Sequence, residues 1–380
     1  MTHADLPESD ENKAAPAPSV VAKNANLAAA KAAKNDEFYT QWADVEREMN
    51  AYLDYDPDVF RDKVVLLPCD DPEWSNFTKF FALRFTDLGI KKLISTSYAA
   101  DAKPSTPYDP TELETAAPQY DPAKTRSRGK KFTLTAQDIN GDGVVNIEDL
   151  QWEYLNGDGD FRSDEVTALR DGADVVVTNP PFSLFREYLA WLVEGGVKFA
   201  AIGNQNAITY KEVFPFIKGN TVWLGTSAPK SFRDGDHSDA APLKSFGNIR
   251  WFTNIEHGRR HAPLQLMTMT DNIKHSPKKE VRGVGYKDYD NYKAIEVPFV
   301  EAIPADYSGV MGVPISFLDR HDPDQFEILW QASGNTKTSA PAKILKKLGY
   351  KKHKDDRGGC GVVDGKRVYS RILIRRKASK

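Results

Sequence analysis

One stretch of the sequence decides the fold: Ala173-Asp174-Val175-Val176-Val177-Thr178-Asn179-Pro180-Pro181-Phe182. Its apolar run, residues 175–177, has the composition of a buried parallel strand. The strand must stop at the two prolines, because proline fixes φ and has no backbone N–H to donate. Residues 183–192 then have the apolar spacing of a helix, with Ser183 placed to cap it. The stretch predicts a strand, a rigid turn and a helix, and ligands bind at that end of a strand in open α/β sheets.

The turn carries an amide, a proline carbonyl and an aromatic ring, which together suit methyl transfer to an exocyclic amine. A ring-conjugated NH2 group is a poor nucleophile, and its two hydrogens need acceptors so that the lone pair can leave the ring plane. The Asn179 side-chain oxygen and the Pro180 carbonyl can each take one hydrogen, and Pro181 holds that carbonyl in place. Phe182 offers a face on which a flipped base can stack. The alternative is a plain strand-ending turn, since Asn-Pro is a common turn starter.

The alternation of strand and helix continues on both sides of this stretch. Apolar runs predict further strands at 63–67, 91–97, 197–203, 221–224 and 249–253, with helices among them. Alternating units of this kind form a mostly parallel sheet with helices on both faces. The sequence therefore predicts the α/β class.

Residues 174–182 resemble motif IV of the amino-group methyltransferases that use S-adenosylmethionine. The wider chain resembles the EcoRI-type adenine-specific DNA methyltransferases, and the similar segments are 36–41, 69–72, 75–77, 157–163, 174–182 and 203–210, with a weaker similarity at 312–329. The resemblance implies a Rossmann-like class I methyltransferase domain with a mostly parallel seven-stranded sheet, followed by a mixed α+β target-recognition region.

The resemblance also implies a reaction and its partners. The enzyme would use S-adenosylmethionine to methylate the N6 of adenine in a short duplex DNA sequence, after flipping the base into its pocket. Asn179, Pro180, Pro181 and Phe182 would be the catalytic residues. A restriction endonuclease that acts on the same DNA site is an expected partner, unless the chain is an orphan modification enzyme. Enzymes of this family can work as monomers.

Two segments are expected around the cofactor by resemblance. Phe38, Tyr39 and Thr40 would belong to an aromatic-rich segment that folds over the cofactor. The alternative is an ordinary helix start with Phe38 in the core. Asp160 would accept a hydrogen bond from the adenine amino group of the cofactor, and Phe161 would stack on its ring. The rival interpretation of this second segment is a calcium-like turn, because polar residues alternate at 156, 158 and 160.

A third cofactor segment follows the strand predicted at 63–67, where this fold usually has a glycine-rich turn. This chain has acidic residues there instead. Asp70 and Asp71 could accept hydrogen bonds from the ammonium group of the cofactor, and the Asn76 amide could meet its carboxylate. The missing glycines leave the detailed contacts open.

Residues 138–149 match a calcium-binding loop in the spacing of their oxygen-bearing side chains. The expected ligands are Asp138, Asn140, Asp142, Asn146 and Asp149, with Gly143 at the sharp turn. The closing residue is Asp instead of the usual bidentate Glu, and the preceding residues look like a strand, so this is not a full EF-hand. The alternative is a turn of Asp, Asn and Gly that caps a helix from Ile147 to Leu155.

Composition and charge divide the chain into three parts. Residues 1–35 are rich in Ala, Pro, Lys and Asn, which predicts a disordered tail. Residues 36–256 would form the catalytic domain, with an insertion at 101–150 that contains the calcium-like loop. Residues 257–380 would bind and recognise DNA, because lysine and arginine dominate the sequence from Lys343 onward although the net charge is −3. The alternative for this basic end is a solvated terminal segment.

The composition fits a globular protein of 380 residues with 40% hydrophobic and 28% charged residues. Its two cysteines, Cys69 and Cys360, lie far apart and form no metal or disulfide pattern, which suits a cytoplasmic protein. No apolar run reaches transmembrane length, and the acidic start does not resemble a signal peptide, so no membrane association is expected.

Two other functions stay open at this stage. An enzyme of the same fold could methylate N6 of adenine in RNA or the amide of a glutamine in a protein. A protein of another class could be a calcium-binding module without catalysis, built around residues 138–149. Binding of S-adenosylmethionine would separate the two classes.

Overall fold

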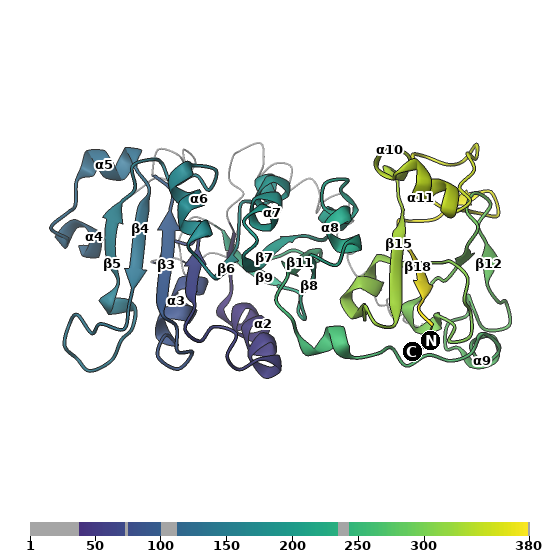
Figure 1. Ribbon diagram of the computed structural model, residues 1–380, viewed down its shortest axis with the longest axis horizontal. Helices are drawn as coiled ribbons and strands as arrows, with labels where there is room; N and C mark the ends of the chain where they lie inside the picture. Colours follow the sequence, from purple (N-terminus) through teal and green to yellow (C-terminus); the bar gives the residue numbers. More distant parts are fainter. Residues whose placement is uncertain (1–37, 73–74, 100–111, 235–242, 379–380) are drawn as a thin grey trace, which may run out of the picture.

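The structure is a computed structural model, and it describes residues 38–72, 75–99, 112–234 and 243–378. The predicted tail, residues 1–35, lies outside the described residues, as does part of the predicted insertion. Two large β-sheets lie side by side along the long axis of the molecule (Figure 1). One has eight strands and the other has five.

The eight-stranded sheet has the order β5-β4-β3-β2-β6-β7-β11-β8. Its strands are β2 (Val64–Leu67), β3 (Lys92–Ser97), β4 (Lys130–Leu134), β5 (Gln151–Tyr154), β6 (Val175–Thr178), β7 (Lys198–Asn204), β8 (Trp223–Leu224) and β11 (Ile249–Thr253). The four central strands, β3, β2, β6 and β7, run parallel. From β2 the chain passes to β3 on one side and later to β6 on the other, so the strand order reverses between β2 and β6. That position is the expected ligand crevice of an open α/β sheet.

The sheet is mixed, and it differs from the mostly parallel, seven-stranded sheet that we expected. The pairs β3·β4, β4·β5, β7·β11 and β11·β8 are all antiparallel. The reason on the β3 side is visible in the register, where Lys130 at the start of β4 pairs with Ser97 at the end of β3. Because the chain re-enters the sheet at the edge that it left, the next strand must run in the opposite direction.

Helices cover both faces of the large sheet, as the sequence predicts. One face packs against α2 (Trp42–Tyr55) and α3 (Asn76–Leu83), and the other packs against α6 (Asp164–Asp171), α7 (Phe185–Glu194) and α8 (Phe214–Lys218). The central strands divide their side chains between the two cores with the period of two that a strand imposes. Val65 and Val175 join the first core, whereas Leu66 and Val176 join the second.

The helix after the central turn begins later than its sequence suggests. A 3-10 turn, η3 (Phe182–Leu184), comes first, and its closing bond runs from the Leu184 N–H to the Pro181 carbonyl at 3.0 Å. Helix α7 therefore starts at Phe185 with Leu184 as its N-cap. The prediction of Ser183 as a helix cap is wrong, because that residue lies inside the 3-10 turn.

The five-stranded sheet, order β12-β13-β14-β18-β15, is built from residues 287–376. Its strands are β12 (Lys287–Asp288), β13 (Ile295–Glu296), β14 (Met311–Pro314), β15 (Phe326–Ala332) and β18 (Arg371–Arg376). Around it lie α9 (Met269–His275), α10 (Thr336–Ser339), α11 (Ala342–Lys347) and the hairpin of β16 (Val362–Val363) and β17 (Lys366–Arg367). The core on the α7 face continues into this sheet, for example where the rings of Phe214 and Trp330 lie 5.5 Å apart.

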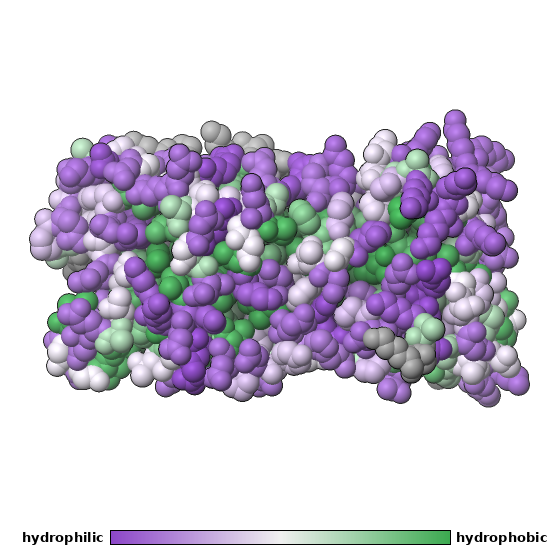
Figure 2. Space-filling model, in the orientation of Figure 1, coloured by the Kyte–Doolittle hydropathy of each residue, from purple (hydrophilic) through white to green (hydrophobic). Residues whose placement is uncertain are grey.

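The remaining elements are short. A small sheet joins β1 (Phe38–Thr40), β9 (Ser231–Asp234) and β10 (Lys244–Ser245), and α4 (Glu112–Ala116) and α5 (Pro122–Ser127) precede β4. Polar side chains cover most of the face in Figure 2, with apolar ones visible between them. Among the described residues, no helix combines the length and the apolar character needed to span a bilayer.

Candidate active site

The Asn-Pro-Pro-Phe turn lies where the ends of β2 and β6 meet. Thr178, the last residue of β6, is completely buried, and its hydroxyl donates to the Pro68 carbonyl at 2.6 Å. This bond ties the segment after β2 to the segment after β6 at the point where the strand order reverses. Asn179 follows directly, so its position is fixed by a buried strand and by two prolines.

Phe182 contacts a part of the chain that is distant in sequence. Its ring is half-buried and meets the ring of Phe232 at 6.4 Å and 83°, an edge-to-face contact. Phe232 is fully buried in β9, directly opposite Thr40 of β1. The small sheet therefore brings the predicted 38–40 segment up to the Asn-Pro-Pro-Phe turn.

The acidic turn after β2 is built around a buried carboxylate. Asp70 is 3% exposed, and the Ser75 hydroxyl donates to its Oδ1 at 2.7 Å. The same Ser75 caps α3 by accepting from the Phe77 N–H, and Thr78 donates to the Asp70 carbonyl at 2.8 Å. Asp71 precedes α3, and its carbonyl accepts from the Ser75 N–H at 2.7 Å. The start of α3 thus holds both aspartates at the carboxyl edge of the sheet.

Asn76 connects this turn to the predicted aromatic segment. Its side-chain amide donates to the Thr40 carbonyl at 2.8 Å. Thr40 is 2% exposed, so the end of β1 is packed against the start of α3. The structure accordingly brings the 38–40 segment up to Asn76 and the acidic turn, although Thr40 and Asn76 are 36 residues apart in the sequence.

The predicted Asp160 segment reaches the same edge through a close backbone approach. Gly159 has a φ of +87°, and a Cβ on it would lie 2.5 Å from the Ser97 carbonyl at the end of β3. Only glycine fits there. Asp160 follows, and the guanidinium of Arg162 holds its carboxylate at 2.6 and 2.9 Å, which lowers the pKa of Asp160 and keeps it ionised.

Phe161 lies in the core behind this segment. Its ring is 1% exposed and is enclosed by Tyr188, at a centroid distance of 4.6 Å, and Trp191, at 5.5 Å. In this arrangement the ring supports the wall of the site, and its expected stacking on the cofactor stays a prediction. Asp160 is the member of the pair that faces outward, with a quarter of its side chain exposed.

Sequence reasoning missed three residues that build this edge. Thr178 could have been noticed as the hydroxyl that directly follows the apolar run 175–177, and Tyr98 directly follows β3. The Tyr98 hydroxyl lies 3.5 Å from the Cys69 sulfur, and burial together with that thiol raises the pKa of Tyr98. Phe232 lies in a polar segment, and the sequence around it does not indicate a role in the site. Its contact with Phe182 depends on the pairing of β9 with β1.

In the calcium-like loop, the side-chain oxygens accept hydrogen bonds from backbone N–H groups of the loop itself. The Asp149 carboxylate, 1% exposed, accepts from the N–H groups of Ile139, Asn140 and Asn146 at 2.7–3.3 Å. The other predicted ligands do the same: Asp138 accepts from Gly141 and Gly143, Asn140 from Asp142, Asp142 from Val144, and Asn146 from Glu148. Nowhere in the described ranges do three His, Cys, Asp or Glu side chains gather as a metal site would need. The calcium prediction is not supported, because these side chains cap the 3-10 turn η2 (Ile147–Asp149). The helix expected from Ile147 to Leu155 is wrong, because the chain enters β5 at Gln151.

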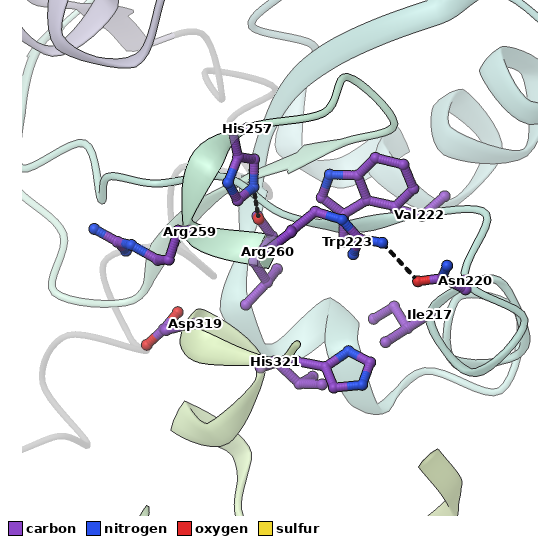
Figure 3. Close-up of a pocket in the computed structure, with 11 residues that line it drawn as sticks. Ile217, Asn220, Val222, Trp223, His257, Arg259, Arg260, Asp319 and His321 are labelled. Atoms are coloured by element: carbon purple, nitrogen blue, oxygen red, sulfur yellow. Dashed lines mark hydrogen bonds between the residues drawn. The ribbon is translucent and has the colours of Figure 1, made fainter. Parts of the chain in front are cut away.

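A small cavity lies at the junction of the two large sheets, away from the Asn-Pro-Pro-Phe turn (Figure 3). Arg260 lies across it, with its guanidinium 3.7 Å from the centre of the Trp223 ring and a bond to Asn220 at 2.9 Å. His257 bonds the Leu224 carbonyl at 3.0 Å, and burial lowers its pKa to about 4. With a volume of about 10 Å³ the cavity has room for one water molecule. It is part of the packing between the sheets.

Known proteins match this chain along most of its length. The family model described as "Adenine-specific methyltransferase EcoRI" matches residues 26–377. The chain is 39% identical over 322 residues to the type II methyltransferase M.EcoRI of Escherichia coli, covering 81% of this chain and 89% of that one. It is 32% identical over 365 residues to the type II methyltransferase M.MpnI of Mycoplasma pneumoniae, covering 92% and 97%. No solved structure matches significantly. Because the family model spans nearly the whole chain, the protein belongs to the EcoRI family of adenine-specific methyltransferases.

Proposed function

We propose that this protein transfers the methyl group of S-adenosylmethionine to the N6 of adenine at a specific site in duplex DNA. One observation carries the proposal: in a chain of the adenine-specific family, Asn179 follows β6 at the edge where the strand order reverses. Ligands bind at that place in open α/β sheets. Residues 36–256 would form a Rossmann-like catalytic domain, and residues 257–380 would read the DNA.

The reaction forms an N–CH3 bond as an S–CH3 bond breaks, and the methylated amine releases one proton to solvent. Asn179 Oδ1 and the Pro180 carbonyl would accept the two amine hydrogens, which turns the nitrogen lone pair toward the methyl group. Pro181 would fix the carbonyl, and Phe182 would stack on the flipped base. Catalysis would come mainly from positioning, which needs no strong base.

The residues at the carboxyl edge fit S-adenosylmethionine, which supplies an activated methyl group on a sulfonium when bound. Its ammonium needs acceptors, and Asp70 and Asp71 lie on the turn after β2. Its adenine amino group needs one too, and Asp160 is held ionised by Arg162. The Asn76 amide is bonded to Thr40, so we assign it to holding the 38–40 segment over the cofactor.

The five-stranded sheet is attached so that the basic helix α11 lies on the side of the carboxyl edge of the eight-stranded sheet. The side chains of Gln331 and Asn335, at the end of β15, both donate to the Thr209 carbonyl, which follows the carboxyl end of β7. Helix α10 and the basic helix α11 continue from there, at the end of the second sheet in Figure 1. This continuity supports one DNA-binding face across both sheets.

Exposed lysines on and after α11 suit contacts with phosphates. They are Lys343, Lys346, Lys347, Lys351, Lys352 and Lys354. Of the three on the helix, only Lys347 has a carboxylate within ion-pair distance among the described residues, Glu327 at 3.9 Å. Neutralising phosphates with such side chains gives binding that weakens steeply with salt.

Family membership makes an RNA-adenine methyltransferase, a glutamine methyltransferase and a non-catalytic calcium module poor alternatives. The relatives are named type II methyltransferases, and a restriction endonuclease with the same DNA site would be the partner of such an enzyme. We propose that the protein acts as a monomer.

Transfer of labelled methyl groups tests the proposal. The purified protein is incubated with labelled S-adenosylmethionine and, separately, with duplex DNA, structured RNA and a glutamine-bearing protein. Label is expected only in DNA, as N6-methyladenine, and raising the salt concentration should raise the KM for DNA. Label in RNA alone would keep the fold and overturn the substrate.

A further inference from the structure

Helix α2 carries a carboxylate that the reaction itself does not require. Glu48 is completely buried, and its Oε1 accepts from the Thr226 N–H at 2.8 Å. Its Oε2 accepts from the Ser227 N–H at 2.7 Å, the Ser227 hydroxyl at 2.6 Å and the Thr226 hydroxyl at 3.0 Å. No lysine or arginine in the described part of the chain lies within ion-pair distance of it. A buried charge held only by hydrogen bonds is costly unless every bond is made.

A second carboxylate on the same face of α2 holds the far end of the same segment. Asp44 lies four residues earlier, one helical turn away, and is 6% exposed. Its Oδ2 accepts from the N–H groups of Lys230 and Ser231 at 2.9 and 3.4 Å. The two side chains therefore fix residues 226–231 at both ends.

Close packing fixes where this segment begins. A Cβ on Gly225 would lie 2.1 Å from Oε1 of Glu48 and 2.7 Å from the Cβ of Trp251. Neither neighbour can withdraw easily, because Glu48 and Trp251 are both completely buried. The backbone at 225 can approach the carboxylate only as glycine.

The segment leads directly into β9 and so to the catalytic turn. Ser231 is the first residue of β9, and Phe232 follows it. The Phe232 ring packs against Phe182 at 6.4 Å and against Phe246 at 5.5 Å. Glu48 is thus connected to Phe182 through residues 226–231 and Phe232.

We infer that Glu48 is a positioning residue for the target base. With Asp44 it holds residues 226–231, so that Phe232 keeps Phe182 in the orientation on which the flipped adenine stacks. Hydrogen bonds to a charged acceptor are roughly twice as strong as those between neutral groups. The Glu48 carboxylate can therefore hold residues 226–231 in place, whereas an apolar side chain would only fill the space. The inference rests on the proposed function, because it affects catalysis only if Phe182 contacts the base.

The variant Glu48→Gln tests this inference, because glutamine has nearly the same shape as glutamate. Its NH2 group cannot accept the hydrogen bonds that Oε2 accepts from Thr226 and Ser227. The kcat for methyl transfer to DNA should fall by between about tenfold and a hundredfold, the range for a displaced group in a site. The affinity for S-adenosylmethionine should fall less than kcat, because the Asn76 amide still holds Thr40 of the 38–40 segment. With 2-aminopurine at the mapped target adenine, the fluorescence gain that reports base flipping should shrink.

Glu46→Gln is the matched control, because it makes the same chemical change at a half-exposed position of the same helix. It should behave as the wild type in every measurement. Ser227→Ala removes a single donor from the other side and should lower kcat less than Glu48→Gln does. The double variant should show a smaller loss than the two single losses combined, because both act on one set of bonds.

The outcomes separate three cases. A folded Glu48→Gln protein with wild-type kcat and a wild-type 2-aminopurine signal overturns the inference, even if its melting temperature falls. If that variant does not fold, Ser227→Ala decides: unchanged kcat and fluorescence overturn the inference, and a lowered kcat supports it. A wild-type protein that methylates no DNA refutes the proposed function instead.

Discussion

The turn at 179–182 and the loop at 138–149 are both short polar motifs, yet they use their side chains differently. In the loop, Asp138, Asn140 and Asp142 all accept hydrogen bonds from backbone N–H groups two to five residues later. In the turn, the residue two places after Asn179 is Pro181, which has no N–H to donate. The usual turn in which an Asn side chain bonds the N–H two residues on cannot form there.

A polar motif indicates a ligand site only when its own backbone cannot satisfy its side chains. A loop with many N–H groups can satisfy its own carboxylates, and its spacing then mimics a metal site. A turn with two prolines has lost those donors, so its amide must be satisfied from elsewhere. The number of backbone donors within a motif is thus as informative as its oxygens.

The largest effect is expected from Asn179→Ala, which removes the side-chain acceptor for the target amine. The rate of methyl transfer to DNA should fall by about a hundredfold to a thousandfold, as for the loss of one aligned hydrogen-bonding group in an active site. The melting temperature should stay close to that of the wild type, because Asn179 follows the buried strand and does not belong to it. Kinetics at saturating cofactor, with calorimetry as control, would measure both.

Pro181→Ala should have a smaller effect on the same site. It supplies the N–H that the turn lacks and lets the Asn179 oxygen bond its own backbone, so the rate should fall by up to about tenfold, the equivalent of one hydrogen bond. In an Asn179→Ala background the same change should cause a smaller loss, because Pro181 then only fixes the Pro180 carbonyl. An equal loss in both backgrounds would mean that Pro181 acts through that carbonyl alone.

Asp149→Asn should lower stability and leave catalysis alone. The N–H groups of Asn146, Ile139 and Asn140 hold the pKa of Asp149 below its ordinary value. A lowered pKa in the folded state stabilises the fold above the ordinary pKa of the group, and this stability is lost as the pH falls through the lowered value. The difference between the melting temperatures of wild type and variant should therefore be smaller at pH 3 than at pH 7.

Calcium should have the smallest effect of all. A site filled at a hundred times its dissociation constant would stabilise the protein by about 2.7 kcal/mol, which would shift the melting temperature visibly. We expect no shift with either added calcium or a chelator. A calcium-dependent rise that Asp142→Asn abolishes would show that the loop rearranges to bind the ion.

Local patterns predicted the elements well. The strands expected at 63–67, 91–97 and 249–253 correspond to β2, β3 and β11, because each is a buried apolar run that decides its own conformation. The predicted start of the helix that became α7 was two residues too early. The 3-10 turn before it depends on a hydrogen bond to the Pro181 carbonyl, which the spacing of apolar residues does not reveal.

The directions of the strands at the sheet edges and the packing around the site could not be predicted from local sequence patterns. The antiparallel β4 depends on where the chain re-enters the sheet after residues 98–129, and Phe232 meets Phe182 only because β9 pairs with β1. Such long-range pairings leave no periodic signal in the sequence. The site was predicted from the resemblance of the Asn-Pro-Pro-Phe segment to motif IV of the amino-group methyltransferases. The residues that surround it became visible only in the structure.

Sequencing of methylated bases tests whether Asn179 is needed for methylation of adenine in DNA. Plasmid DNA is treated with S-adenosylmethionine and either the wild-type protein or Asn179→Ala, and N6-methyladenine is mapped at single-base resolution. Modified adenines are expected in one short sequence context with the wild type, and a nearly complete loss of signal is expected with the variant. Equal modification by both proteins would contradict the role of Asn179, and with it the account of the turn.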